Sequence, residues 1–225
     1  MDQFLEANKA FELGNYEKAR EDYTKIVGQG ITNGKLFYNL GNTCVRLGKI
    51  GDALLYYRKA EQWIPRDGDL KFNINYVLGL TKDKIESRGS ERFINLLFFW
   101  YNKFSLTELL YIFLGINLIF WSSGIALHFK KNEFIKSLWL LSLAVNVIMG
   151  STLITKAYLN SHDHQGVVIE NEIIVRSGYG VNNSVLFKLH EGAEFKVLDK
   201  TEGWFKIVLS DGKIGWIEGR FVGII

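Results

Sequence analysis

Residues 105–155 read SLTELLYIFLGINLIFWSSGIALHFKKNEFIKSLWLLSLAVNVIMGSTLIT, and this stretch contains two long apolar runs. Leu109–Leu127 and Ser137–Thr155 carry no charged residue, and each approaches the roughly 20 apolar residues with which an α-helix crosses a bilayer. The connection, residues 128–136, is short and charged. Two buried helices of a soluble core are the alternative, but nothing else in the chain could cover them. The sequence therefore predicts a transmembrane hairpin over 105–156, with the regions before and after it on the same side.

Polar and small residues within the two runs predict how the helices pack. Asn117 and Asn146 lie at nearly the same distance from the turn between the runs, hence at nearly the same depth. Ser142, Asn146 and Gly150 recur every four residues, which places them on one face of the second helix. Such faces allow close approach of membrane helices. We expect Asn117 and Asn146 to meet; the alternative is that each amide bonds its own helix backbone.

Composition excludes several classes of function. The formal net charge is only +3 and the two signs are interspersed, so the chain does not have the basic character of a nucleic-acid-binding protein. Cys44 is the single cysteine, which excludes an intrachain disulfide and a thiolate metal site. Residues 1–4 lead directly into an amphipathic segment without a secretory signal. Either the N-terminal part is cytoplasmic, or a signal has been removed or lies upstream.

An internal repeat occupies residues 1–66. Gly14, Ala19 and Tyr23 recur 34 residues later as Gly48, Ala53 and Tyr57, and residues 7–8 align with 41–42 at the same offset. With Pro65, these positions resemble the tetratricopeptide repeat, in which small residues allow two antiparallel helices to cross. A third unit begins at Asp67 and loses the later small positions, so we expect a closing helix. The prediction is an all-α domain over 1–86 with about two and a half repeats, which a partner or self-association would complete.

The repeat alignment places a set of polar residues on the concave face. They are Asn8, Tyr38, Asn39, Asn42 and Asn73. Amides suit a peptide backbone, so we expect a short peptide or a partner's tail to bind there. The groove resembles the carboxylate-clamp type only in part: Asn8 and Asn39 match, but Phe4, Asp69 and Asn73 stand where that type has basic residues. We therefore expect recognition of the peptide backbone without a strict demand for a C-terminal carboxylate. The alternative is that the asparagines only tie adjacent helices together.

Residues 93–104 are apolar and aromatic but too short to span a membrane. With Trp100 and Tyr101 at headgroup level, this stretch is typical of an interfacial helix. A short re-entrant or packed helix is the alternative.

Residues 166–225 contain short runs rich in β-branched residues, separated by glycine-containing turns, which is typical of a small barrel. The motifs 174–178 (IVRSG), 203–206 (GWFK) and 211–216 (DGKIGW) resemble the bacterial SH3-like domain. That resemblance implies an extracytoplasmic module that binds cell-wall peptide, glycan or protein. The candidate surface residues are Arg176, Tyr179, Trp204 and Trp216. For the two tryptophans the alternative is the core, where aromatic residues of small barrels more often lie.

The sequence presents no catalytic constellation. The four histidines fall in a membrane loop, a linker and a barrel loop, and Cys44 lies inside a repeat helix where packing explains it. A nucleophile needs a base oriented by a third group, and none is apparent. His162 and His164 lack further clustered ligands, so we expect no metal site. The prediction is a non-enzymatic protein without a cofactor.

The order of parts resembles the BatE-type proteins of the Bacteroides-aerotolerance (Bat) group: tetratricopeptide repeats, an aromatic helix, two spans and a C-terminal SH3-like barrel. The resemblance implies a non-enzymatic inner-membrane scaffold that works with von Willebrand A-type membrane proteins and a MoxR-type ATPase, in aerotolerance or envelope stress. The alternative function is a cell-wall-binding sensor in which the barrel carries the essential activity.

The membrane side follows from two opposing signals. Lys130, Lys131 and Lys136 lie in the loop, but Arg88, Arg92 and Lys103 precede the first span, so the positive-inside count is nearly tied. The usual location of the barrel family favours a cytoplasmic loop with both soluble domains in the periplasm, whereas the missing secretory signal favours the opposite orientation. We expect a two-pass protein of the bacterial inner membrane in that orientation.

Overall fold

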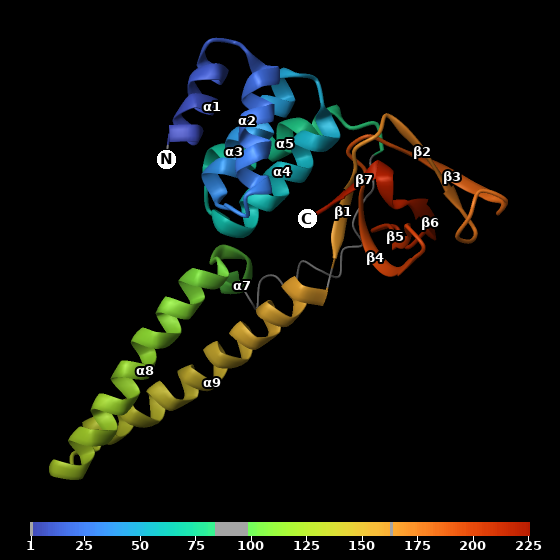
Figure 1. Ribbon diagram of the computed structural model, residues 1–225. Coiled ribbons are helices and arrows are strands. Elements are labelled where there is room, and N and C mark those ends of the chain that lie inside the picture. The colour runs from blue at the N-terminus through green and yellow to red at the C-terminus, as the bar shows by residue number, and fades with distance from the viewer. Residues whose placement is uncertain (1, 84–98, 163) are drawn as a thin grey trace. The chain divides into compact units, whose positions relative to one another are not determined.

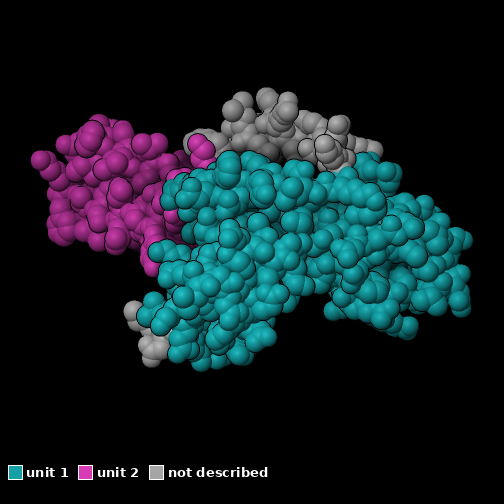
Figure 2. All heavy atoms as spheres, turned by 90° about the horizontal axis from the view of Figure 1, so that it is seen from above, with its two compact units in different colours: residues 1–92, 163–225 teal, residues 93–162 magenta. Residues whose placement is uncertain are grey.

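The computed structural model describes residues 2–83, 99–162 and 164–225, which form two compact units (Figure 1). The first unit combines residues 1–92 with 163–225, and the second comprises residues 93–162 (Figure 2). The fold class is confirmed: helical repeats, two apolar helices and an all-β barrel occur in the predicted order. The repeats and the barrel, which the sequence analysis treats as two separate domains, belong to one compact unit.

Residues 2–83, the part of the repeats that the structure describes, contain five helices. Their bounds are α1 Asp2–Glu12, α2 Tyr16–Gly28, α3 Gly34–Arg46, α4 Ile50–Trp63 and α5 Gly68–Leu80. Asn15, Asn33 and Asp67 begin α2, α3 and α5, because each side chain accepts a hydrogen bond from a backbone N–H three residues later. Gly14 and Gly48 turn the chain between the paired helices at φ of 77° and 71°, the left-handed region that glycine adopts readily.

The small repeat positions allow the close helix crossing that the sequence predicts. A Cβ atom at Gly41 would lie 2.5 Å from the ring of Tyr57, so any larger residue would separate α3 from α4. Ala19 and Ala53 are fully buried, and Tyr23 and Tyr57 are among the largest buried side chains. Two core clusters result, one beneath α1–α3 and one beneath α3–α5.

The second unit is a helical hairpin. Its helices are α7 Phe99–Lys103, α8 Leu106–Phe129 and α9 Glu133–His162. Ser105 and Glu108 form a capping box at the start of α8, with both reciprocal bonds present. The helices α8 and α9 are long and apolar enough to cross a membrane. The start of the predicted interfacial helix, residues 93–98, lies outside the described residues.

The barrel is one antiparallel sheet of seven strands in the order β3-β2-β6-β5-β4-β1-β7. The bounds are β1 Gln165–Val168, β2 Glu172–Arg176, β3 Val185–His190, β4 Glu194–Thr201, β5 Trp204–Val208, β6 Ile214–Glu218 and β7 Val222–Ile224, with a 3₁₀ turn at Gly219–Phe221. Its core includes Phe195, Ile207 and Ile217.

The two tryptophans do not lie in that core. Phe205 and Ile207 of β5 point into the barrel, so Trp204, which alternates with them, points to the outer face. Ile217 of β6 likewise points inward, which turns Trp216 outward. Both tryptophans are only partly buried. The core alternative is therefore wrong for both.

Candidate functional site

A hydrogen-bonded triad joins the first three repeat helices at the predicted groove. The Asn8 Oδ1 atom accepts from the Tyr23 hydroxyl at 2.6 Å and from the Asn39 Nδ2 atom at 3.0 Å. The three residues come from α1, α2 and α3, so the amide of Asn8 connects one repeat to the next. Tyr23 is buried beneath the groove, where burial raises the pKa of its hydroxyl and keeps it neutral.

The same triad occurs again 34 residues later. The Asn42 Oδ1 atom accepts from the Tyr57 hydroxyl at 2.7 Å and from the Asn73 Nδ2 atom at 3.1 Å. The Asn73 amide also donates to the Tyr38 hydroxyl at 3.1 Å. All five predicted groove residues thus participate in bonds between helices. Because one amide can form up to four hydrogen bonds, these contacts leave capacity for a ligand, and peptide binding stays a prediction.

A pocket of about 220 Å³ opens between α1 and α3 at the first triad. Its lining consists of Asn8, Phe11, Glu12, Tyr23, Asn39 and Asn42. Glu12 is the acidic residue of this lining and is exposed to solvent. Three of the predicted groove residues, Asn8, Asn39 and Asn42, therefore line one concave pocket.

On the barrel, three of the four predicted surface residues lie together. Arg176 of β2 is paired in register with Trp216 of β6, and the Tyr179 ring lies 5.6 Å from the Trp216 ring at an interplanar angle of 58°. Trp204 lies on the same outer face, paired with Glu218 at the far end of β6. The arrangement offers an aromatic corner beside a guanidinium group, which can stack on and donate to a ligand.

Asn183, which is not among the predicted surface residues, organises the loop beside this corner. Its side-chain amide donates to the backbone oxygens of Tyr179 at 2.8 Å and Gly180 at 3.2 Å, and its backbone oxygen accepts from Arg176 at 2.8 Å. The side chain therefore fixes Tyr179, and the backbone of the same residue fixes Arg176. The asparagine pair at 182–183, followed by serine, is the turn signal that could have indicated it.

The repeats and the barrel share an apolar interface. Val167 of β1 is fully buried in the core cluster of α3–α5, and Ile225 packs against the same cluster. A Cβ atom at Gly223 of β7 would overlap the side chain of Leu55 on α4, so the strand and the helix lie in direct contact. Glu191 accepts from the backbone N–H of Gly51 at 2.8 Å.

An ion pair with two hydrogen bonds reinforces this interface. The Arg58 Nε atom of α4 donates to Glu194 Oε1 at 2.7 Å, and the second bond, from a terminal nitrogen to Oε2, is 3.1 Å long. Arg58 also donates to Glu61 at 2.8 Å. Burial alone would lower the pKa of Arg58, but the bonds and charges of Glu194 and Glu61 raise it, so the guanidinium stays charged. Arg58 and Glu194 are 136 residues apart, too far for the sequence to pair them.

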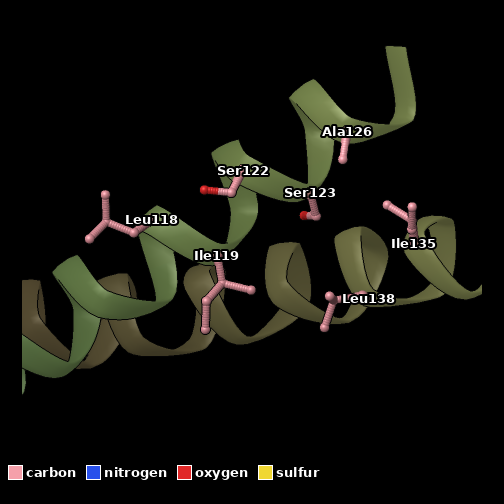
Figure 3. A pocket seen from close by; sticks show the side chains of 7 residues that line it. All are labelled: Leu118, Ile119, Ser122, Ser123, Ala126, Ile135 and Leu138. Atoms are coloured by element: carbon pink, nitrogen blue, oxygen red, sulfur yellow. The ribbon is translucent and has the colours of Figure 1, made fainter. Parts of the chain in front are cut away.

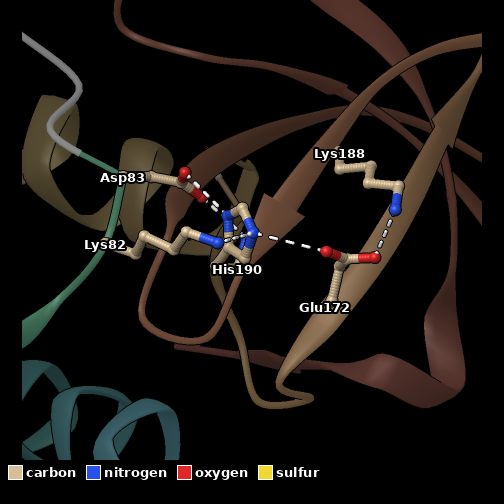
Figure 4. A network of polar contacts seen from close by, with 5 residues as sticks. All are labelled: Lys82, Asp83, Glu172, Lys188 and His190. Atoms are coloured by element: carbon tan, nitrogen blue, oxygen red, sulfur yellow. Dashed lines mark hydrogen bonds and ion pairs between the residues drawn. The ribbon is translucent and has the colours of Figure 1, made fainter.

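A second polar network joins the end of the repeats to the barrel (Figure 4). Asp83 accepts from the backbone N–H of His190 at 2.6 Å and contacts its Nδ1 atom at 3.0 Å. The Lys82 ammonium, which can only donate, lies 2.8 Å from Nε2, so Nε2 accepts and Nδ1 donates to Asp83. Glu172 lies 3.5 Å from Nε2 and bonds Lys188 at 2.6 Å; the bond from Lys188 lowers the pKa of Glu172.

Within the hairpin, the two predicted asparagines are in contact. Asn117 Nδ2 donates to Asn146 Oδ1 at 2.8 Å, and Asn146 Nδ2 donates to the backbone oxygen of Ser142 at 2.9 Å. The pair thus bonds both across the helices and within one of them. A Cβ atom at Gly150 would make ordinary contact with Phe113, so this glycine also faces α8. Towards the loop, the helices leave a shallow apolar pocket that includes Ser122, Ser123 and Leu138 (Figure 3).

The described part of the predicted interfacial helix, α7, packs against α9. The Lys156 ammonium donates to the backbone oxygens of Tyr101 and Phe104 at 2.6 Å each, and lies 5.0 Å from the Tyr101 ring centre. The Trp100 indole donates to Thr152 at 3.5 Å. Lys156 therefore caps the carboxyl end of α7 from the neighbouring helix, a role that the sequence does not indicate.

The described residues supply little reactive chemistry. Cys44 is fully buried, and burial, followed by the charge of Asp52, raises the pKa of its thiol to about 12. A thiol in this state is a poor nucleophile because the thiolate is the reactive form. In the ranges that the structure describes, no group of three or more His, Cys, Asp and Glu side chains is placed to hold a metal ion.

Comparison with known proteins identifies both soluble parts. Residues 171–223 match the bacterial SH3 domain, and residues 34–67 match the tetratricopeptide repeat. The chain is 39% identical over 49 residues to the probable endopeptidase p60 of Listeria monocytogenes serovar 1/2a (strain ATCC BAA-679 / EGD-e), and 43% identical over 51 residues to that of Listeria seeligeri. These matches cover 21% and 22% of this chain and 10% of each relative. Fold and matches together define a multidomain protein with a protein-interaction repeat and a bacterial SH3 domain.

Proposed function

We propose that this chain is a non-enzymatic, membrane-anchored adaptor that binds a protein partner through its repeats and a cell-envelope ligand through its barrel. The observation that carries the proposal is the shared interface of the two soluble parts. The Arg58–Glu194 pair and the burial of Val167 in the repeat core hold the groove and the aromatic corner in one unit. An adaptor needs both surfaces held together, whereas an enzyme needs a reactive group.

The finer features of the proposal derive from the resemblance to BatE-type proteins. The partners are von Willebrand A-type membrane proteins and a MoxR-type ATPase, and the process is aerotolerance or envelope stress. The location is the bacterial inner membrane, with both soluble parts in the periplasm. Such an orientation gives the barrel access to cell-wall peptide or glycan.

A cell-wall-binding sensor is the second candidate, and the outward position of Trp216 beside Tyr179 and Arg176 favours it. Aromatic rings on an exposed sheet face are suited to stacking on sugar or peptide ligands. In this case the barrel carries the essential activity, and the repeats serve only to position it.

The two candidates are separated by testing the surfaces one at a time in the full chain. Binding to purified peptidoglycan is measured by co-sedimentation, and partner binding by site-specific cross-linking in cells. For an adaptor, Tyr179→Ala with Trp216→Ala abolishes sedimentation and leaves the cross-links intact, while the groove variant Asn39→Ala with Asn42→Ala does the reverse. If the barrel variant removes all cellular activity and the groove variant removes none, the sensor is correct. Absence of both binding activities contradicts both candidates.

A further inference from the structure

The repeat offset of 34 residues shows that the third repeat changes the chemistry of the groove. Three groove positions recur at this offset, each with one residue on α1, one on α3 and one on α5: Phe4, Tyr38 and Phe72; Asn8, Asn42 and Tyr76; Glu12, Arg46 and Leu80. Members of α1 and α3 line the pocket described above, and Asn73 of α5 bonds Asn42 and Tyr38 on that same side. The equivalent residues of α5 therefore belong to the groove.

On α5 these positions are apolar and exposed. Phe72, Tyr76 and Leu80 have 71%, 53% and 51% of their surface accessible, and their spacing of four places them on one face of the helix. We call these three residues the apolar stripe. Contiguous exposed apolar side chains of this size mark an interaction surface, because each leaves a large apolar area in contact with water.

The opposite side of the groove carries the acidic residue Glu12. Glu12 lines the 220 Å³ pocket together with Asn8, whose Oδ1 atom already accepts two hydrogen bonds, and Asn39, whose Oδ1 atom can accept from a ligand. Among the described residues Glu12 has no ion-pair partner. The cation at the equivalent position of the second repeat is Arg46, which donates to the Tyr16 hydroxyl at 2.6 Å and stacks on the Tyr16 ring. The pocket therefore lacks a positive charge and suits one long side chain that only donates.

We infer that the groove binds a partner segment with a lysine or arginine for the Glu12 pocket and bulky apolar side chains for the apolar stripe. This inference rests on the proposed function and specifies its partner. Neighbouring helices pack about 8–10 Å apart, so the pocket between α1 and α3 lies about 10–15 Å from the stripe on α5. An extended chain advances about 3.3 Å per residue, which separates the basic and apolar residues of the partner by about three to five positions.

The test uses defined synthetic peptides and the full chain in lipid nanodiscs. The probes are fluorescently labelled twelve-residue peptides composed of Gly, Ser and Asn, with one Arg and, about four residues away, Phe and Leu. They are made in two orders, with the Arg before or after the apolar residues. Matched peptides carry Glu for Arg, or Ser for both apolar residues. Fluorescence anisotropy gives the affinity. We expect one order to bind at least tenfold more tightly than either matched peptide.

Variants of the chain assign the effect to the groove. Glu12→Lys is expected to reverse the preference, so that the Glu peptide binds more tightly than the Arg peptide. Glu17→Lys makes the same charge change on the exposed surface of α2 and is expected to leave the preference unchanged. Phe72→Ser with Leu80→Ser is expected to remove the advantage of the apolar peptide. Circular dichroism melts confirm that each variant is folded.

The inference is overturned if neither chain order exceeds its matched peptides, or if Glu12→Lys and Glu17→Lys behave alike, because the attraction is then non-specific. Its failure is distinguishable from that of the adaptor. If the variants Glu12→Lys and Phe72→Ser with Leu80→Ser still cross-link to the partner in cells, only the assigned chemistry of the partner segment is wrong. If the unaltered chain cross-links to no partner in cells, the adaptor function itself is contradicted.

Discussion

Replacing Arg58 with methionine removes the guanidinium that joins α4 of the repeats to β4 of the barrel. The side chains of Arg58 and Glu194 are 25% and 35% exposed, so the pair is neither fully buried nor fully solvated. Breaking a buried pair costs about 3–5 kcal/mol, and an exposed pair contributes about 0.2–1 kcal/mol. Partial burial and two short bonds place the expected loss between these limits, at about 1–3 kcal/mol.

The assay is a double-mutant cycle on the nanodisc-bound chain. Arg58→Met, Glu194→Gln and the combined variant are compared by urea unfolding and by hydrogen exchange of the amides in α4, β1 and β7. We expect a coupling energy above about 0.5 kcal/mol and faster exchange at the interface in each single variant. The Arg20–Asp52 pair, 3.3 Å long and confined to the repeats, is the control. Breaking it is expected to loosen the repeats without raising exchange in β1 and β7.

Two results would refute this reasoning. Strictly additive effects of the two substitutions would show that Arg58 and Glu194 do not interact in solution. Separate unfolding transitions of the repeats and the barrel in the unaltered chain would show that the interface does not couple them.

Three further predictions concern the hairpin, the buried thiol and the membrane side. Asn117→Leu and Asn146→Leu are each expected to weaken association of the two spans by about 0.6 kcal/mol. The double variant is expected to cost less than the sum, because the two side chains share one hydrogen bond. Steric-trap unfolding in bilayers measures these free energies, and strictly additive effects would exclude the contact. Cys44, with its pKa raised to about 12, is expected to react with iodoacetamide at pH 8 about 1,000-fold more slowly than a free cysteine. If Cys44 of the folded chain reacts as fast as a free cysteine, its burial is contradicted. A cysteine introduced by Glu133→Cys, with Cys44 first replaced by alanine, is expected to resist an impermeant thiol reagent added to intact spheroplasts, whereas labelling from outside would place the loop in the periplasm.

The sequence predicted features that depend on local spacing. The recurrence of small residues predicted close helix crossings, and Ala19 and Ala53 are fully buried as such crossings require. Gly14 and Gly48 belong to the same pattern for a different reason, because they lie in turns whose left-handed backbone favours glycine. Helix geometry placed Asn117 and Asn146 at one depth, and the structure joins them at 2.8 Å. Such inferences succeed because rise and periodicity are fixed by the helix itself.

Features that depend on long-range packing could not be predicted. Nothing near Arg58 in the chain indicates that Glu194 lies beside it, and the burial of Val167 among repeat residues depends on how two separate folds meet. Trp204 and Trp216 illustrate a third limit. Their hydrophobicity suggested the core, but the alternation of β5 and β6 directs them outward, and the phase of a strand is set by its neighbours.

An adaptor of the proposed kind holds a protein partner and an envelope ligand on one chain at the same time. The most direct test mixes purified partner, peptidoglycan and the full chain in nanodiscs, and measures how much partner sediments with the peptidoglycan. The partner is first identified by cross-linking from the groove. An adaptor is expected to bring the partner into the pellet only when the chain is present, and Trp216→Ala or Asn39→Ala with Asn42→Ala is expected to abolish this. If the chain binds partner and peptidoglycan separately but never both together, the adaptor function is contradicted.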